Sequence, residues 1–235
     1  DVSPEVVEII NGGEIHIVEP DLAMLVRSAV ATGKLKATLS TESADVFIIA
    51  VPTPLIPHER KPDLSFLEIA ADSIAPVLEK GNLVVLESTS PVGTTKRLAM
   101  RMAKQRPDLS FPLDSQEEVD VHFACCPERV LPGSILRELV SNDRIIGGLT
   151  KKCAQQAESF YRIFVRGECL LTDDKTAELC KLTENAFRDV NIAFANELSM
   201  ICDGLDINLW ELIHLANHHP RVNVLKPGPG VGGHC

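Results

Sequence analysis

Long apolar runs are absent from this chain of 235 residues. The apolar stretches at residues 46–51 and 83–86 are far shorter than the roughly 20 consecutive apolar residues that a transmembrane helix requires. No basic segment followed by an apolar run opens the sequence, so no secretory leader is visible. We therefore expect a protein with no membrane partner.

Basic residues are in deficit. Lysine and arginine number 23 against 33 aspartates and glutamates, which gives a formal net charge of −10. Non-specific nucleic-acid binding relies on a basic surface that displaces counterions from phosphates. The composition therefore excludes nucleic acid as an expected partner, and an anionic ligand needs a local cluster of cations.

Cysteine spacings typical of a metal site or a disulfide framework are also lacking. The seven cysteines are an odd number without CxxC spacing, which is typical of reduced thiols in a reducing compartment and not of a disulfide framework or a zinc site. We therefore expect a location in the cytoplasm. His218 and His219 have no third ligand at metal spacing. The sequence therefore predicts no metal site, and phosphate or sugar contacts are favoured for these imidazoles.

Short strands alternate with helices over most of the chain. Residues 45–51 are a β-branched apolar run that ends at a Pro-Thr-Pro turn, the pattern of a central parallel strand buried on both faces. Further strands are expected at residues 82–87, 119–126, 144–148 and 168–171, with helices at 63–80, 94–104 and 151–164. In the first helix Asp63 is the expected cap, Pro76 a kink and Gly81 the terminator. This alternation predicts an α/β fold with a doubly wound parallel sheet.

The pattern changes near Asp173. Residues 175–202 contain no proline or glycine and keep helical periodicity, so they predict one long helix. A second helix is expected at 209–216, followed by a loop rich in proline and glycine. We therefore divide the chain into residues 1–172, an α/β domain, and 173–235, an all-helical domain.

Lys181, Asn185 and Arg188 stand at positions i, i+4 and i+7 of the long helix. Their side chains share one face and can converge on an anionic or carbonyl-bearing ligand. The alternative is a solvated polar face, in which Arg188 pairs with Glu184. Cys235 follows a glycine run and is a candidate nucleophile if a nearby cation lowers its pKa, although loop cysteines are more often inert.

Polar residues follow two of the expected strands, where open α/β sheets bind ligands. Residues 87–95 offer hydroxyls for a ribose, a nicotinamide or a water, unless Thr94 or Thr95 only caps the next helix. Glu128 and Arg129 follow another strand, where Glu128 can also simply pair with Arg129 or a neighbour. Asp1 is a candidate ribose ligand, and the adjacent Cys125 and Cys126 are strand residues without chemistry.

Five ordered motifs resemble the UDP-glucose/GDP-mannose 6-dehydrogenase family, at residues 51–54, 87–95, 126–133, 177–185 and 227–235. Residues 187–198 and 219–223 look most like its branch that oxidises UDP-N-acetyl-D-mannosamine. The resemblance implies a Rossmann-like domain that binds NAD, followed by a central helical domain. It also implies that Asp1 stands inside the fold, after a missing first βα unit with its glycine fingerprint, and that a C-terminal nucleotide-binding domain is missing. We therefore expect an internal piece of a longer enzyme.

The resemblance implies oxidation of the sugar C6 alcohol to a carboxylate by two hydride transfers to NAD, for surface polysaccharide synthesis. Cys235 then forms a thioester that water hydrolyses. Lys181 donates or accepts a proton and, with Asn185, stabilises an oxyanion. Thr89 and Glu128 orient water and protons.

The resemblance also assigns ligand contacts. The cofactor-binding residues are Asp1, Thr53 and Thr95. The substrate-binding residues are Arg129, Val130, Lys181, Asn185, Arg188, His219, Arg221 and Gly232. With Lys226, the five cations of this region suit a diphosphate despite the negative net charge. Pro132 stands where UDP-glucose dehydrogenases carry a second glutamate, which favours N-acetylated sugars over glucose, and UDP-N-acetylglucosamine or UDP-glucose are the alternatives.

A homodimer through the long helix is implied as well, with Phe187, Val190, Phe194 and Leu198 facing a partner helix or the core. A reading of a different class is that this chain alone is a catalytically incomplete dimerisation and binding fragment.

Overall fold

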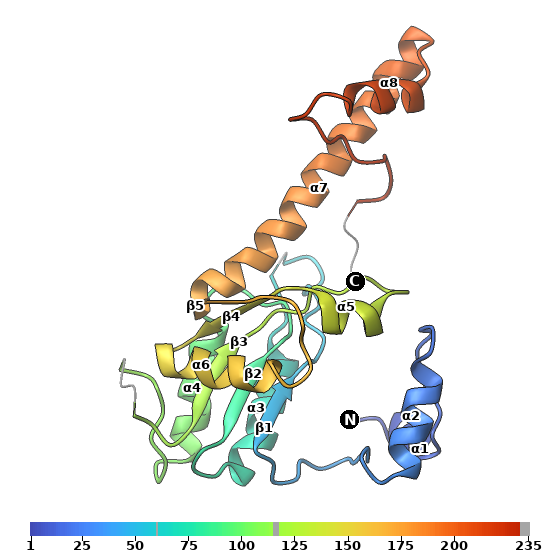
Figure 1. Cartoon of the computed structure of the whole chain (residues 1–235). Coiled ribbons are helices and arrows are strands. Elements are labelled where there is room, and N and C mark those ends of the chain that lie inside the picture. The colour runs from blue at the N-terminus through green and yellow to red at the C-terminus, as the bar shows by residue number, and fades with distance from the viewer. Residues whose placement is uncertain (60, 115–117, 231–235) are drawn as a thin grey trace. The chain divides into compact units, whose positions relative to one another are not determined.

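The computed structural model describes residues 1–59, 61–114 and 118–230 (Figure 1). It contains two compact units, Asp1–Leu179 and Cys180–Cys235. The division falls inside the long helix, slightly downstream of the boundary predicted near Asp173. Within the described residues no helix is long and apolar enough to cross a membrane.

The first unit is built on a five-stranded sheet whose spatial order follows the chain. Its strands are β1 (Val46–Ile49), β2 (Leu83–Leu86), β3 (His122–Cys125), β4 (Arg144–Gly148) and β5 (Cys169–Asp173). β1, β2 and β3 are parallel, and so are β4 and β5. The predicted α/β fold is confirmed, and all five strands fall where the sequence pattern places them.

One strand pair departs from a fully parallel sheet. β3 and β4 are antiparallel and share only two residue pairs, Ala124 with Gly148 and Cys125 with Gly147. The connection between them contains only the short helix α5 (Ile135–Ser141), which does not cover a face of the sheet. Because no crossover returns the chain to the start of β3, β4 begins at the end of the sheet where β3 finishes and runs in the opposite direction to β3.

The predicted central position of β1 is wrong for the described residues, because β1 lies at one end of the sheet. Phe47 and Ile49 are buried, whereas Ile48 is 43% exposed. A short apolar run indicates that the side chains of a strand are buried against helices on the faces of the sheet. It does not indicate whether the strand has a neighbour on both sides.

Helices cover both faces of the sheet (Figure 1). On one face α3 (Ser65–Ile74) and α4 (Thr94–Gln105) pack on Val84 and Leu86 of β2. On the other face α6 (Lys151–Tyr161) packs on the alternate β2 residues, Leu83 and Val85. Strands buried on both faces are the mark of a doubly wound sheet.

The first predicted helix is shorter than residues 63–80. α3 ends at Ile74, and Pro76 lies in the 3-10 turn η1 (Ala75–Val77) that follows. Proline has no N–H to donate to the preceding turn, so it ends the α-helix here instead of kinking it. The side chain of Asp63 accepts a hydrogen bond from the backbone N–H of Ser65 at 2.9 Å, and hydrogen bonds to Ser65 lower its pKa.

Two helices before the sheet, α1 (Pro4–Asn11) and α2 (Leu22–Ala31), were not expected from the sequence. α1 begins with a Ser-Pro pair in which the Ser3 hydroxyl caps the N–H of Val6 at 3.4 Å. This Ser-Pro pair is a local signal for the start of a helix that the sequence itself contains.

The long helix is confirmed as α7 (Asp174–Leu205), which begins in the first unit and continues into the second. α8 (Leu209–Ala216) matches its predicted bounds, and Asn208 caps it by accepting from the N–H groups of Trp210 and Glu211. Within the second unit Ala195, Cys202 and Ile213 are buried.

Candidate active site

The ends of β1 and β2 are joined by side-chain hydrogen bonds. The Thr53 hydroxyl donates to the backbone carbonyl of Thr89 at 2.7 Å, and the Ser88 hydroxyl donates to the carbonyl of Val51, also at 2.7 Å. Two residues that the sequence singles out, Thr53 for the cofactor and Thr89 for catalysis, therefore meet at the carboxyl edge of the parallel strands. This edge is where doubly wound sheets bind ligands.

The start of α4 is capped by a residue that sequence reasoning missed. The buried Glu178 carboxylate accepts from the N–H of Gly93 at 2.5 Å, from the N–H of Thr95 at 2.8 Å and from the Thr95 hydroxyl at 2.7 Å. A carboxylate is stabilised at a helix N-terminus. The Glu178 side chain therefore caps α4, and the Thr94 and Thr95 side chains do not. Because the Thr95 hydroxyl donates its proton to Glu178, it cannot donate to a ligand.

A buried hydroxyl in the same segment lacks a partner. Ser90 is 4% exposed, and its oxygen has no hydrogen-bond partner among the described residues. A buried polar group without a partner is destabilising. Ser90 is therefore a group that a ligand at this edge could satisfy.

A second cluster of charged and polar groups gathers beyond the ends of β2 and β3. The Tyr161 hydroxyl donates to the Glu87 carboxylate at 2.5 Å, and the Arg144 guanidinium donates to Glu128 at 3.0 Å. Glu128 thus pairs with Arg144, one of the neighbours left open by the sequence. Its carboxylate also accepts the backbone N–H groups of Arg129 and Val130, so three predicted site residues share one set of hydrogen bonds.

Burial shapes the pKa values in this cluster. It raises the pKa of Glu87 above the ordinary 4.5; the Glu128 charge adds to this rise, and the Tyr161 hydrogen bond opposes it. Burial also raises the pKa of the Cys126 thiol to about 12 and that of Cys125 well above its usual range. Both cysteines therefore remain protonated and unreactive at neutral pH.

The raised pKa of Glu87 predicts a pH-dependent contribution to stability. Because the folded state holds this proton more tightly than the unfolded state, the contribution is present below the unfolded pKa and is lost as pH rises through the folded value. We expect the melting temperature of Glu87→Gln to rise relative to that of the natural chain as the pH increases above the ordinary carboxyl value of 4.5. Exposed Glu8→Gln is the control, and a gap for Glu87→Gln that does not change with pH would contradict this account.

The candidate ribose ligand Asp1 is exposed at the start of the chain. One carboxylate oxygen accepts the N–H of Ser3 at 2.8 Å. The second carboxylate oxygen has acceptor positions to offer a hydroxyl.

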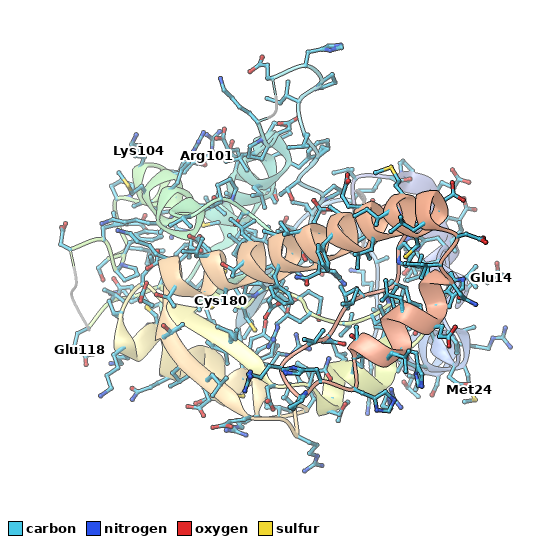
Figure 2. The ribbon with its side chains drawn as sticks, turned by 90° about the horizontal axis from the view of Figure 1, so that it is seen from above. Glu14, Met24, Arg101, Lys104, Glu118 and Cys180 are labelled. Carbon is cyan, nitrogen blue, oxygen red and sulfur yellow. The ribbon has the colours of Figure 1, made fainter. Side chains whose placement is uncertain are left out.

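In the second unit, Lys181, Asn185 and Arg188 lie along α7 beyond Cys180, which Figure 2 labels. The Arg188 guanidinium donates to the Asn185 side-chain oxygen at 3.2 Å, so these two groups share one face of the helix. Lys181 and Asn185 are half-buried, and Arg188 is exposed. Cationic and amide groups side by side suit an anionic ligand.

Two asparagines hold the loop that follows α8. The Asn196 side chain of α7 donates to the carbonyl of Gly228 and accepts its N–H, both at 2.9 Å. Asn217 makes the same pair of hydrogen bonds with Val224, at 3.0 and 2.7 Å. Both donors and acceptors of the loop backbone are satisfied at these points, as in a strand pairing. The loop between them is therefore fixed at two places.

Removing one of these supports should destabilise the loop. We expect Asn196→Ala to lower the free energy of unfolding by about 1 to 3 kcal/mol, because two hydrogen bonds to the backbone of Gly228 are lost. Asn191→Ala is the matched control, since Asn191 lies on the same helix and its side chain donates only to the helix carbonyl of Phe187. Urea denaturation measures both variants, and equal losses of stability would contradict the role of Asn196.

The remaining predicted ligand residues also belong to this loop. The N–H of Arg221 donates to the imidazole of His219 at 3.3 Å, so the two residues lie together. His214 and His218 face each other, with 3.4 Å between their Nε2 atoms. Among the described residues, no three histidine, cysteine or acidic side chains are grouped to hold a metal. Gly232 and Cys235 lie outside the described residues.

Comparison with known proteins decides the family. Residues 1–165 match the NAD binding domain of the UDP-glucose/GDP-mannose dehydrogenase family, and residues 175–235 match its central domain. The chain belongs to this family. The similarity thus covers both the sheet edge and the α7 face described above.

Individual dehydrogenases of the family are similar over the whole chain. An NDP-N-acetyl-D-galactosaminuronic acid dehydrogenase from Ralstonia nicotianae is 65% identical, and the chain covers 55% of it. A UDP-N-acetyl-D-mannosamine dehydrogenase from Campylobacter jejuni is 62% identical, with 58% covered. The solved structure of a UDP-D-ManNAc dehydrogenase from Pyrococcus horikoshii is 46% identical, with a TM-score of 0.91 and 55% of that chain covered. The chain therefore spans slightly more than half the length of these dehydrogenases.

Proposed function

We propose that this chain is part of a complete dehydrogenase that oxidises the C6 alcohol of UDP-N-acetyl-D-mannosamine to the uronate with NAD, for surface polysaccharide. The observation that carries the proposal is the similarity of the entire chain to dehydrogenases of N-acetylated sugar nucleotides. Pro132, at the position of a second glutamate in the glucose enzymes, points the same way.

Each catalytic residue has a separate task in the proposal. Lys181 exchanges the proton of the C6 hydroxyl, and with Asn185 it stabilises the negative charge that develops on that oxygen. Cys235 attacks the C6 aldehyde as a thiolate and is later released from a thioester. Thr89 and Glu128 orient water and protons. NAD, when bound, supplies the acceptor for the hydrides.

Cationic and polar side chains bind the anionic substrate in the proposal. Arg188, His219 and Arg221 belong to the second unit, where the guanidinium of Arg188 and the backbone of Arg221 make the contacts described above. Arg129 and Val130, with Gly232, complete the set. Arginine suits a diphosphate because its planar fork matches phosphate oxygens.

The residues at the sheet edge fit an NAD molecule. Ser90 offers a buried hydroxyl without a partner, and Gly93 adopts a φ of 93° with open space where a side chain would stand. Asp1, Thr53 and Thr95 are the proposed cofactor contacts. The Thr53 and Thr95 hydroxyl protons are already donated, to Thr89 and Glu178, so both hydroxyls act toward the cofactor as acceptors.

An N-acetylgalactosamine nucleotide is the second candidate substrate, because the Ralstonia relative is named for that uronic acid. NADH formation by the complete enzyme with UDP-N-acetylmannosamine, UDP-N-acetylgalactosamine, UDP-N-acetylglucosamine and UDP-glucose separates these possibilities. We expect kcat/KM to be highest with the first. Preference for any other sugar would overturn the mannosamine assignment, and activity with none would overturn the proposed function.

The proposal includes a homodimer formed through α7. Phe187 and Val190 are both 67% exposed, and Phe194 is 53% exposed. Exposed apolar side chains along one helix favour association with a second copy. Light scattering of the complete enzyme should give twice the mass of one chain, and a monomer at micromolar concentration would contradict this part.

A cytoplasmic location is also proposed. The support for it is the cysteine pattern of the sequence, an odd number without CxxC spacing. Cell fractionation tests it, and recovery of the enzyme outside the cytoplasm would contradict it.

A different class of function is favoured by one observation: the chain covers only 55% to 58% of these relatives. By itself it would then be a dimerisation and binding fragment without turnover. We expect the 235-residue chain to form no NADH with any of the four sugars, and saturable NADH formation by it would rule this reading out.

A further inference from the structure

Four elements of the first unit bring one hydrogen-bonded cluster together. Glu87 follows β2, Glu128 follows β3, Arg144 begins β4 and Tyr161 ends α6. The Arg144 side chain is 2% exposed, and its guanidinium carbon lies 5.6 Å from the centre of the Tyr161 ring. The hydroxyl of the same Tyr161 donates a hydrogen bond to the Glu87 carboxylate at 2.5 Å. Arg144 is therefore held by an aromatic ring that has its own anchor.

Arg144 makes two directed hydrogen bonds. One guanidinium nitrogen donates to Oε2 of Glu128 at 3.0 Å, and the other donates to the backbone carbonyl of Leu139 at 3.2 Å. Because the guanidinium is planar and its second terminal nitrogen is held by the Leu139 carbonyl, it determines the orientation of the Glu128 carboxylate that it binds. A lysine at this position would keep the charge but lose the two-point geometry.

The acceptor positions of Glu128 can be counted. A carboxylate offers about four lone-pair positions, two on each oxygen. Oε1 accepts the N–H groups of Arg129 at 2.5 Å and Val130 at 2.9 Å, and Oε2 accepts from Arg144. One position on Oε2 is left. The Glu128 side chain is 33% exposed, so this position is accessible to a water or a substrate group.

We propose that Arg144 is a positioning residue, which fixes Glu128 so that the single free acceptor position on Oε2 orients the water that hydrolyses the thioester. This inference rests on the proposed function, because it requires the thioester on Cys235. It adds Arg144 and its supporting pair, Tyr161 and Glu87, to the residues on which the reaction depends.

The step is chemically balanced. The water oxygen adds to the thioester carbon, the carbon–sulfur bond breaks, and the sulfur leaves as the Cys235 thiolate. The water gives one proton to Glu128, which returns it to solvent, and the second proton is lost from the product acid to leave a carboxylate. No oxidant or reductant is needed in this step, since both hydrides have already left.

A purely structural ion pair is the competing explanation. Loss of a structural pair lowers the amount of folded enzyme and slows every step equally. Loss of a positioning residue slows hydrolysis selectively, so the covalent intermediate accumulates after both hydrides have left. Burst kinetics separates these two explanations.

The test uses the complete enzyme with Arg144→Met, Arg144→Lys and Glu128→Gln. Arg101→Met is the control, because Arg101 (Figure 2) also binds carboxylates, Glu68 and Asp72, but these ion pairs join α4 to α3. Rapid mixing with NAD and the preferred sugar measures the NADH burst, and acid quenching followed by intact-mass measurement detects the acyl group on Cys235.

We expect Arg144→Met to lower kcat by about 100-fold, the effect of a small misplacement. It should show a burst of two NADH per active site and an acyl adduct, and we expect the same of Glu128→Gln. Arg144→Lys should show the same adduct with a smaller loss, and Arg101→Met neither effect.

Lower kcat without burst or adduct in both Arg144 variants would overturn the inference while the proposed function stands. Unchanged kcat in Arg144→Lys and Arg144→Met would do the same. Failure of the natural enzyme to form NADH from any sugar would overturn the proposed function, and the inference with it.

Discussion

Replacing Cys235 by alanine in the complete enzyme should abolish uronate formation, with a loss of at least about 10³-fold. In the proposed mechanism, the C6 aldehyde cannot form the adduct from which the second hydride leaves when this thiol is missing. Product analysis by chromatography, together with NADH absorbance, measures both halves of the reaction.

Cys180→Ala is the control for loss of a thiol, because Cys180 is half-buried on α7 and has no role in the proposed chemistry. It should retain the natural rate of uronate formation. Uronate formation by Cys235→Ala at more than about a tenth of the natural rate would remove Cys235 from the proposed mechanism.

The second large effect is on stability. A methyl group at Gly148 would collide with the backbone of Thr150 and Ala154, where α6 begins directly after β4. Backbone atoms on both sides of the site cannot move independently, so overpacking is severe. We expect Gly148→Ala to lower the free energy of unfolding by about 3 kcal/mol or more, measured by urea denaturation followed by circular dichroism.

Gly204→Ala is the matched control, with the opposite sign. Gly204 lies in α7 and has nothing within 4 Å of an added methyl group. Alanine is favoured over glycine in a helix by up to about 1 kcal/mol. A destabilisation by Gly204→Ala similar to that by Gly148→Ala would show that the crowding at Gly148 is not the cause.

Local patterns predicted the strands and most of the helices, but not all of the strand pairing. The five strands follow from short apolar runs, and α7 and α8 follow from helical periodicity, whereas α1, α2 and α5 were not predicted. The antiparallel pairing of β3 with β4 and the end position of β1 depend on how the chain returns to the sheet. The periodicity of apolar residues within a strand indicates neither the direction of its neighbour nor its position in the sheet.

The candidate site shows the same division. Glu128 and residues 87–95, which include Thr89, were predicted from their place after strands, whereas Thr53 was predicted only from the family resemblance. The structure brings Thr53 and Thr89 together. Glu178 and Arg144 were missed as partners. Glu178 lies 83 residues from Thr95 in the sequence, so only tertiary structure makes the helix cap visible.

Glu19 is another buried carboxylate whose partners are distant in the sequence. Glu19 is 6% exposed and accepts the N–H groups of Gly133 and Ile135, each at 2.8 Å, before α5. From the sequence, a charged residue in a polar segment is predicted to be exposed to solvent. Its burial is decided by backbone donors far along the chain, which no local pattern records.

The ratio of NADH to uronate tests the central claim most directly. The complete enzyme is supplied with a limiting amount of UDP-N-acetylmannosamine and excess NAD, and both products are measured at completion. Oxidation of the C6 alcohol through a cysteine thioester predicts two NADH for each uronate, with no free aldehyde. One NADH for each sugar, with an aldehyde or ketone as the product, would contradict the account.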